Sequence, residues 1–422
     1  MVYKITKPDK SLSGTIYLTS SKSESNRVLL VQALCSQKFK ITNIADSQDT
    51  QILSEILKNE TSGEHYQALK KLNVEVSYYT GAGGTTIRFL TAFFASREGT
   101  RILSGSERMN ERPVKNLVDA LKKLGAKITY LGKEGYPPLK IEGKPLQGGE
   151  VEMDASVSSQ FVTALLLIAP AMKNGLTLRL KGNVVSRSYI RMTLKILDHF
   201  GVKHSWKENI ITVEPQQYQG WDYQVEADWS SASYWYEMAA LAQECDLFIK
   251  GLKRNSIHGD SSVAGLFGFF GINTEFREDG IRLVKTGYKP DHLGFDFSDY
   301  PDIVQTSAVA AAALQIPIQM NGLHTLRVKE TDRIEALKTE LKKIGVVAEE
   351  TGKTSLEIKK FNNKTPAKTF QTYQDHRMAM SFAPLALVYP EVRIENPSVV
   401  KKSYPDFWND LKTAGFEITE EA

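Results

Sequence analysis

The segment LVDALKKLGAKITY, residues 117–130, predicts a helix that ends at a glycine and leads into a strand. Apolar residues recur at helical spacing before Gly125, and strand-like residues follow it. Glycine fits best in the left-handed backbone that commonly ends a helix, so Gly125 marks the expected C-terminus. The segment therefore predicts one helix–strand unit of an α/β protein.

The same pattern recurs along the chain. Four further segments carry Gly201, Gly271, Gly345 or Gly415 at the equivalent position, and a sixth has Asn73, the next best residue there. The six positions are spaced 52 to 76 residues apart, too far for a solenoid repeat. We expect six copies of a larger α/β unit, three in each of two compact lobes. The alternative is that helix, glycine and strand simply follow one another often in α/β proteins.

Length and composition agree with two domains. A chain of 422 residues exceeds what one hydrophobic core usually supports. Its hydrophobic and charged fractions, 41% and 24%, are those of a globular protein. The net charge of +4 is too small to indicate a nucleic-acid partner, so any anion-binding role must come from locally arranged cations.

The cysteines and the apolar segments indicate a cytoplasmic protein without a membrane partner. Cys35 and Cys245 lie in apolar stretches without metal-ligand or CxxC spacing, which predicts buried thiols in a reducing compartment. The N-terminus lacks the apolar core of a secretory signal, and the longest apolar run, 161–172, is too short to span a bilayer.

Cationic side chains recur where loops are expected to lead into helices. Arginine grips phosphate and carboxylate with two parallel hydrogen bonds, and lysine supplies a point charge. If these junctions converge, they form a pocket for multiply charged anions. The cations are Lys22, Arg27, Arg88, Arg108, Lys329, Arg333, Arg377 and Lys402.

Two carboxylates stand out among these cations. Asp302 taken alone is an acid in the first turn of a helix, where the helix dipole favours it. Glu330 belongs to the charged run RVKETDRIEAL, which taken alone is typical of a solvated helix surface. On a helix, Lys329 and Arg333 would share a face, with Glu330 rotated away from it. Together, two acids among many cations suit acid–base chemistry on anions.

The remaining candidate positions are small and polar. TGAGGTTIRFL, residues 80–90, fails as a P-loop and as a dinucleotide fingerprint, which leaves a glycine-rich turn that leads into a helix start. Ser158, Ser159 and Gln160 precede another apolar helical run, and Ser186 lies in VVSRSYI.

These segments carry a family resemblance. The chain resembles the 5-enolpyruvylshikimate-3-phosphate synthases over essentially its whole length. The resemblance implies an α/β fold of two lobes, each with three βαβαββ units. The motifs that carry it, in the family's order, are SKSESNR, GGTTIRFL, RMNERP, GYPPL, SVSSQF, VSRSYI, ADWSSASY, RNSIHGD, YPDIVQT, RVKETDR, DHRMAM and KSYPDF.

The resemblance also implies an organisation and a set of partners. One lobe would combine residues 1–20 with 228–422, the other would span 21–227, and the active site would lie in the cleft between them. The substrates would be shikimate 3-phosphate and phosphoenolpyruvate, with no metal or organic cofactor, no nucleic acid and a monomeric enzyme. The enolpyruvyl group would pass to the 5-hydroxyl of shikimate 3-phosphate through a tetrahedral intermediate.

The resemblance assigns roles to individual residues. Asp302 would be the base for the 5-hydroxyl and Glu330 the acid for the methylene carbon, with Lys22 a competing or assisting catalyst. Ligands of shikimate 3-phosphate would be Lys22, Ser23, Arg27, Ser158, Ser159, Gln160, Ser186, Asp302 and Lys329. Ligands of phosphoenolpyruvate would be Lys22, Gly84, Arg108, Gln160, Arg333, Arg377 and Lys402.

Some positions depart from the family pattern. Thr19-Ser20 replaces the usual Pro-Gly, Ala82 stands where Asn or Asp is usual, and Thr325 stands where some members have a substrate-binding Asn. Gly84 is retained, which predicts sensitivity to glyphosate.

Two alternative functions stay open at this point. The related UDP-N-acetylglucosamine enolpyruvyl transferases share the fold and the chemistry. A non-catalytic anion-binding homologue would share only the scaffold.

Overall fold

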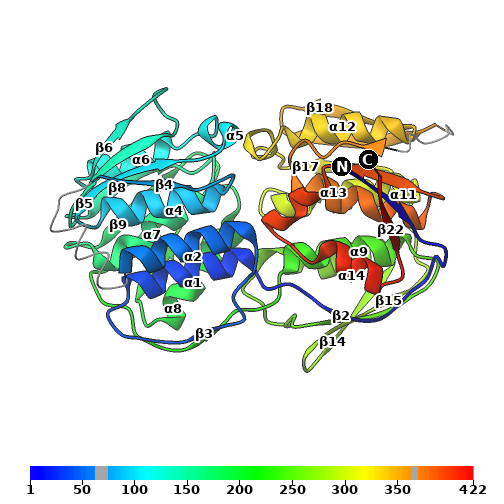
Figure 1. Cartoon of the computed structure of the whole chain (residues 1–422), viewed down its shortest axis with the longest axis horizontal. Coiled ribbons are helices and arrows are strands. Elements are labelled where there is room, and N and C mark those ends of the chain that lie inside the picture. Colours follow the sequence, from blue (N-terminus) through cyan, green and yellow to red (C-terminus); the bar gives the residue numbers. More distant parts are fainter. Residues whose placement is uncertain (62–74, 363–368, 422) are drawn as a thin grey trace. The chain divides into compact units, whose positions relative to one another are not determined.

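The computed structural model describes residues 1–61, 75–362 and 369–421, which form two units (Figure 1). Unit 1 combines Met1–Ser21 with Glu226–Ala422, and unit 2 is Lys22–Val225. The sequence analysis expected the chain to pass between lobes near Ser20 and near Asp228. The unit boundaries lie one residue after Ser20 and between Val225 and Glu226.

Three four-stranded sheets in unit 1 share one design. In each, two neighbouring strands run parallel, and the other two strands continue the sheet antiparallel. Each sheet with its two helices makes one βαβαββ unit, as the sequence predicted. The strands, in sheet order, are β20 (Thr369–Phe370), β21 (Val392–Glu395), β1 (Val2–Thr6) and β22 (Glu417–Glu421); β14 (Ile272–Arg277), β15 (Gly280–Lys285), β13 (Cys245–Lys250) and β2 (Leu12–Tyr17); and β16 (Leu293–Asp296), β17 (Ile318–Asn321), β19 (Ser355–Phe361) and β18 (Val346–Gly352).

The first helix of each repeat lies inside unit 1. These helices are α9 (Trp229–Leu241), α11 (Val304–Leu314) and α13 (His376–Phe382), and they contact one another. Every residue of α9 and α13 is buried. Figure 1 shows the three between a layer with α12 and β18 and a layer with β14 and β15. Because these helices are buried, polar side chains in them, such as Arg377, must find partners inside the protein.

The second helix of each repeat has one exposed side and ends at a predicted glycine. In unit 1 these helices are α10 (Val263–Gly268), α12 (Arg333–Lys343) and α14 (Phe407–Thr413). The glycines after them have φ values of 80° at Gly271, 76° at Gly345 and 83° at Gly415. Gly125 and Gly201 in unit 2 have φ values of 102° and 74°. The prediction of left-handed glycines is therefore confirmed at all five positions, while Asn73 lies outside the described residues.

The described residues of unit 2 form two sheets of the same order and one smaller sheet. The four-stranded sheets are β4 (Val76–Tyr79), β5 (Gly99–Ser104), β7 (Leu139–Gly143) and β6 (Lys127–Tyr130), and β10 (His204–Lys207), β11 (Ile210–Val213), β9 (Leu176–Lys181) and β8 (Gly149–Asp154). The helices are α1 (Lys22–Leu34), α2 (Gln48–Thr61), α4 (Gly84–Ala95), the short α5 (Glu107–Asn110), α6 (Lys115–Lys123), α7 (Ser159–Ile168) and α8 (Arg187–His199).

The third repeat of unit 2 differs from the prediction within the described residues. It shows a two-stranded parallel sheet of β3 (Ile41–Thr42) and β12 (Tyr223–Gln224) rather than four strands. The cysteine prediction also needs a correction. Both thiols are free and Cys245 is buried, but Cys35 is only half-buried, because it follows the last residue of α1.

Candidate active site

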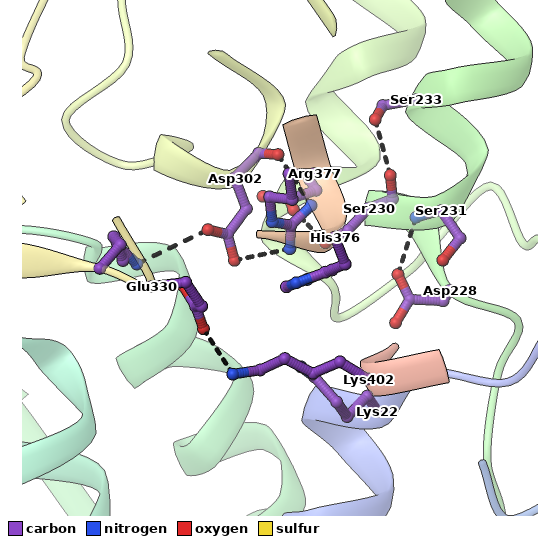
Figure 2. A network of polar contacts seen from close by, with 12 residues as sticks. Lys22, Asp228, Ser230, Ser231, Ser233, Asp302, Glu330, His376, Arg377 and Lys402 are labelled. Atoms are coloured by element: carbon purple, nitrogen blue, oxygen red, sulfur yellow. Dashed lines mark hydrogen bonds and ion pairs between the residues drawn. The ribbon is translucent and has the colours of Figure 1, made fainter. Parts of the chain in front are cut away.

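Asp302 lies in unit 1 among three cations. It belongs to the short helix η3 (Pro301–Ile303), directly before α11. Arg377 Nη2 lies 2.9 Å from Asp302 Oδ2 (Figure 2). On the other oxygen, Arg333 Nη1 lies at 3.2 Å and Lys329 Nζ at 3.6 Å. The carboxylate predicted to be the base is thus surrounded by positive charge.

Glu330 shares one of these cations. Its Oε2 accepts a hydrogen bond from Arg333 Nη2 at 3.1 Å. Its Oε1 lies 2.9 Å from Lys402 Nζ, at the end of η6 (Pro397–Lys402), as Figure 2 shows. Arg333 therefore bridges the two carboxylates that the sequence analysis selected.

Arg333 is held in place by two further acids. It is the first residue of α12, and Asp332 caps this helix by accepting hydrogen bonds from the amides of Ile334 and Glu335. Arg333 Nε donates to Asp375 Oδ2 at 2.7 Å, and Arg333 is only 1% exposed. Burial lowers the pKa of Arg333, but the surrounding carboxylates outweigh burial and raise it, so the guanidinium stays charged.

Burial and neighbouring charges also oppose each other at Asp302, and here the charges lower the pKa. Burial raises the pKa of the Asp302 carboxyl, but Arg377, Lys329 and Arg333 together hold the pKa well below its usual value of 3.8. Asp302 is therefore ionised and able to accept a proton. Its basicity depends on how closely the three cations stay bound to it.

The prediction that Lys329 and Arg333 share one face of a helix is wrong. The short helix η4 (Leu326–Val328) ends before Lys329, and α12 begins only at Arg333. Lys329 lies in the non-helical turn between η4 and α12, and from there its side chain reaches Asp302. Asp332, in the same turn, has the extended backbone of an N-cap. The residues meet because the chain turns there, not because they are four positions apart on a helix.

Arg377 is fixed at the start of α13. The side chain of Asp375 accepts the Arg377 amide hydrogen at 2.9 Å and so caps this helix. The guanidinium donates to the backbone oxygen of Asp302 at 2.9 Å and to Tyr234 Oη at 3.3 Å. Arg377 therefore contacts both the backbone and the carboxylate of Asp302.

In unit 2, Arg27 lies among hydroxyl and carbonyl groups. Its Nε donates to Thr193 Oγ1 at 2.9 Å, its Nη1 to the Ser23 carbonyl at 2.5 Å and its Nη2 to the Tyr189 carbonyl at 3.3 Å. Arg27 is 3% exposed, and burial lowers its pKa to about 10 against the opposing effects of Tyr189 and Glu24. The contacts bring together α1 and the first two turns of α8.

The other predicted polar residues begin helices or flank them. Lys22 is the first residue of α1, and its Nζ lies 3.2 Å from Asp49 Oδ2. Ser158 caps α7 by accepting a hydrogen bond from the Gln160 amide, and Ser159 is the first residue of that helix. Ser186, with a left-handed φ of 54°, directly precedes α8.

A second cationic group of unit 2 surrounds Gly84. Arg88 Nη1 donates to Gln160 Oε1 at 2.5 Å, which links α4 to α7. A Cβ added at Gly84 would lie 2.9 Å from Arg88 Nη1 and 2.9 Å from both terminal nitrogens of Arg112. Two guanidinium groups therefore pack against this glycine, and a side chain here would displace one of them.

Arg108 lies elsewhere. Its side chain is 41% exposed and pairs with Glu111, itself 66% exposed. Arg112, four residues later, is 4% exposed and is the arginine beside Gly84. The motif RMNERP contains both arginines, and only Arg108 was predicted to bind substrate. Arg112 lies between the end of α5 and Pro113. The sequence alone did not indicate which of the two arginines is buried.

Three further residues support the predicted site without having been predicted. Asp375 binds Arg333, Asp49 binds Lys22, and Tyr234 binds Arg377. An acid directly before a helix, as in YQDHRMAM, was a usable signal for Asp375. Nothing in the local sequence marked Asp49 or Tyr234.

The described residues contain neither a candidate metal cluster nor a helix suited to a membrane. Residues 1–61, 75–362 and 369–421 contain no group of three or more His, Cys, Asp and Glu side chains placed to hold a metal ion. Within the same ranges, no helix combines the length and the apolar character needed to cross a membrane.

The fold of two repeat-built units has counterparts among solved structures of enolpyruvyl transferases. An EPSP synthase from Acinetobacter baumannii matches with a TM-score of 0.76 at 20% identity, covering 99% of this chain and 100% of that one. The enolpyruvyl transferase NikO from Streptomyces tendae matches with a TM-score of 0.74 at 15% identity, covering 99% and 98%. These likenesses confirm the predicted fold.

Sequence comparison then narrows the class to one family. The sequence model of EPSP synthase (3-phosphoshikimate 1-carboxyvinyltransferase) matches residues 6–411. A 3-phosphoshikimate 1-carboxyvinyltransferase from Bacteroides fragilis is 44% identical over 420 residues, 99% of each chain. One from Photobacterium profundum is 38% identical, covering 96% of this chain and 97% of the relative. The chain belongs to the EPSP synthase family.

Proposed function

We propose that this protein transfers the enolpyruvyl group of phosphoenolpyruvate to the 5-hydroxyl of shikimate 3-phosphate and releases phosphate, in aromatic amino-acid biosynthesis. The observation that carries the proposal is the pair Asp302 and Glu330, bridged by Arg333 and flanked by Lys329, Arg377 and Lys402. Both substrates are multiply charged anions, and the reaction needs one base and one acid. The membership of the chain in the EPSP synthase family supports the same reaction.

Residues of both units bind the substrates in this proposal. Shikimate 3-phosphate contacts Ser23, Arg27, Ser158, Ser159, Gln160, Ser186, Asp302 and Lys329. Phosphoenolpyruvate contacts Lys22, Gly84, Gln160, Arg333, Arg377 and Lys402. We place Arg112 in the second set instead of Arg108, since Arg112 is buried beside Gly84 while Arg108 pairs with Glu111 at the surface.

The chemistry follows from the two carboxyl groups. Glu330, in its protonated form, delivers a proton to the methylene carbon of phosphoenolpyruvate, which leaves C2 cation-like. Asp302 takes the proton of the 5-hydroxyl, and the oxygen forms a bond to C2. In the elimination, the methyl group returns a proton to Glu330, the double bond forms again, and the phosphate leaves with the electron pair of the bond between C2 and its oxygen. Lys22 assists at the leaving phosphate.

The cations couple substrate binding to the strength of the base. Arg333 and Arg377 bind Asp302 in the structure, and the same two residues are proposed ligands of phosphoenolpyruvate. An anion that draws their hydrogen bonds towards itself weakens their hold on Asp302, which raises the pKa of this carboxyl from its depressed value. Asp302 thereby becomes a better base only when the substrate is present.

The cellular setting belongs to the proposal as well. The enzyme acts as a monomer in the cytoplasm, without nucleic acid as a partner. A UDP-N-acetylglucosamine enolpyruvyl transferase is the second candidate that the fold admits. The whole-chain identity of 44% to a relative named 3-phosphoshikimate 1-carboxyvinyltransferase favours the first.

The direct test measures phosphate release from phosphoenolpyruvate with shikimate 3-phosphate or UDP-N-acetylglucosamine as acceptor. We expect release only with shikimate 3-phosphate. Release only with the nucleotide sugar would move the protein to the related enzymes, and release with neither would leave an anion-binding protein. Asp246→Asn, which alters an exposed ion pair with Arg282 on unit 1, is the matched surface control.

Gly84 allows a second test through glyphosate. We expect glyphosate to inhibit competitively with phosphoenolpyruvate. In Gly84→Ala the new Cβ forces Arg88 or Arg112 to move, since it would lie 2.9 Å from their nitrogens. The variant should need about tenfold more glyphosate for half inhibition, equivalent to about 1.4 kcal/mol of binding. Unchanged inhibition in the variant would remove Gly84 from the phosphoenolpyruvate site.

A further inference from the structure

The turn that leads into α13 contains two consecutive residues with left-handed backbone. Tyr373 has a φ of 52° and Gln374 a φ of 56°, and neither is glycine. This conformation costs free energy for a residue with a Cβ, so two in succession persist only where surrounding contacts impose them. Asp375, which caps α13, and Arg377 follow directly.

The contacts that impose this conformation come from Glu340. Its Oε1 accepts the phenolic hydrogen of Tyr373 at 2.6 Å, and its Oε2 accepts the amide hydrogen of Gln371 at 3.0 Å. Lys343 Nζ lies 2.7 Å from the same Oε2 and balances the charge. Glu340 is fully buried. A buried carboxylate with three partners is well satisfied, so it binds the turn firmly.

Glu340 and Arg333 join the same two segments at separate points. Both residues belong to α12 and lie seven positions apart, roughly 10 Å along the helix. Arg333 binds Asp375 at the start of α13, and Glu340 binds the turn just before it. Two points of attachment fix both the position and the rotation of the turn relative to α12. Loss of one attachment would weaken the hold of α12 on the turn.

We propose that Glu340 is a positioning residue for the reaction. It holds the strained turn of residues 371–374, so that Asp375 meets Arg333 and Arg377 meets Asp302. Glu340 itself binds no substrate. The inference rests on the proposed function, because its consequence is the placement of two phosphoenolpyruvate ligands.

The test combines removal of Glu340 with relief of the strain. Glu340→Ala should raise the KM for phosphoenolpyruvate about tenfold, equivalent to about 1.4 kcal/mol, with little change in the KM for shikimate 3-phosphate. Gln374→Gly removes the cost of the left-handed backbone at that position. In the Glu340→Ala background it should restore most of the lost affinity. Glu340→Gln keeps the size and the accepting oxygen and should give an intermediate KM.

The matched control is Glu335→Ala, which removes an exposed acid from the same helix and should leave both KM values unchanged. A lower melting temperature of Glu340→Ala with unchanged KM values for the folded enzyme would show a purely structural role and overturn the proposal. Failure of Gln374→Gly to rescue would also overturn it.

An activity-independent measurement separates this inference from the proposed function. Amide hydrogen exchange of residues 373–377 should speed up in Glu340→Ala and return towards the wild-type rate with Gln374→Gly. This pattern in a protein without transferase activity would reject the proposed function while preserving the role of Glu340 in holding the turn. Unchanged exchange would reject the role itself.

Discussion

Three aspartates occupy the same place in the three repeats of unit 1, but their side chains bind different partners. Asp228, Asp302 and Asp375 each stand just before or at the start of an interior helix, α9, α11 or α13. Asp228 caps its helix through the Ser231 amide at 2.9 Å. Asp375 caps α13 and also binds Arg333. Asp302 is not the N-cap of α11, which is Ile303, and its carboxylate binds three cations.

The local sequence explains why Asp302 is not the N-cap of its helix. Pro301 starts a 3-10 turn, so α11 begins two residues after Asp302. Arg333, Arg377 and Lys329 supply the partners that helix amides supply elsewhere. A repeated architecture thus offers the same acid three times, and neighbouring side chains decide which one is available for chemistry.

Asp302→Asn should give the largest effect. It keeps the shape of the side chain but removes the proton acceptor, so kcat for phosphate release should fall by about 10² to 10⁴, the usual contribution of general acid–base catalysis. Steady-state assays with both substrates at saturation measure this. Asp246→Asn should keep wild-type kcat. A variant of Asp302 with near wild-type turnover would place the base elsewhere.

Asp375→Asn should mainly cost stability. Asn caps a helix as well as Asp does, but it cannot neutralise the buried guanidinium of Arg333. Removing one partner of a buried ion pair typically costs about 3–5 kcal/mol. Denaturant titration monitored by circular dichroism should show a lower midpoint. If the loss stays below 1 kcal/mol on the same measure, the pair with Arg333 contributes less than its geometry indicates.

The pH dependence of stability should report the depressed pKa of Asp302. A carboxyl whose pKa is depressed on folding stabilises the native state above its unfolded pKa, and this stabilisation is lost as the pH falls through the folded pKa. The advantage of wild type over Asp302→Asn should therefore be full above pH 4 or so and shrink on further acidification. Denaturant midpoints between about pH 3 and pH 6 measure it. Parallel curves for the two proteins would contradict the depressed pKa.

Asp228 should show the smallest effect. Asp228→Ala removes the cap of α9 and should cost about 1 kcal/mol, whereas Asp228→Asn should stay within about 0.5 kcal/mol of wild type. The same denaturant titration compares them. Equal losses in both variants would show that the charge of Asp228, and not its capping oxygen, stabilises unit 1.

Local patterns in the sequence were sufficient for the repeated framework. A glycine after an amphipathic run forms a left-handed helix end because no other residue adopts that backbone as cheaply, and five such glycines do so. The cap at Ser158 and the helix starts at Lys22 and Gly84 follow from equally local chemistry. The whole-chain order of motifs was sufficient for the family.

Tertiary structure alone decided how the charged side chains are used. Arg108 and Arg112 lie four residues apart in similar surroundings, yet only Arg112 packs beside Gly84. Lys329 and Arg333 meet at Asp302 through a turn that their helical spacing did not reveal. Glu340 was one charge in an ordinary amphipathic segment until the fold placed Tyr373 against it. Backbone preferences are local and can be read from neighbours in sequence, whereas an ion pair depends on partners that only folding brings within reach.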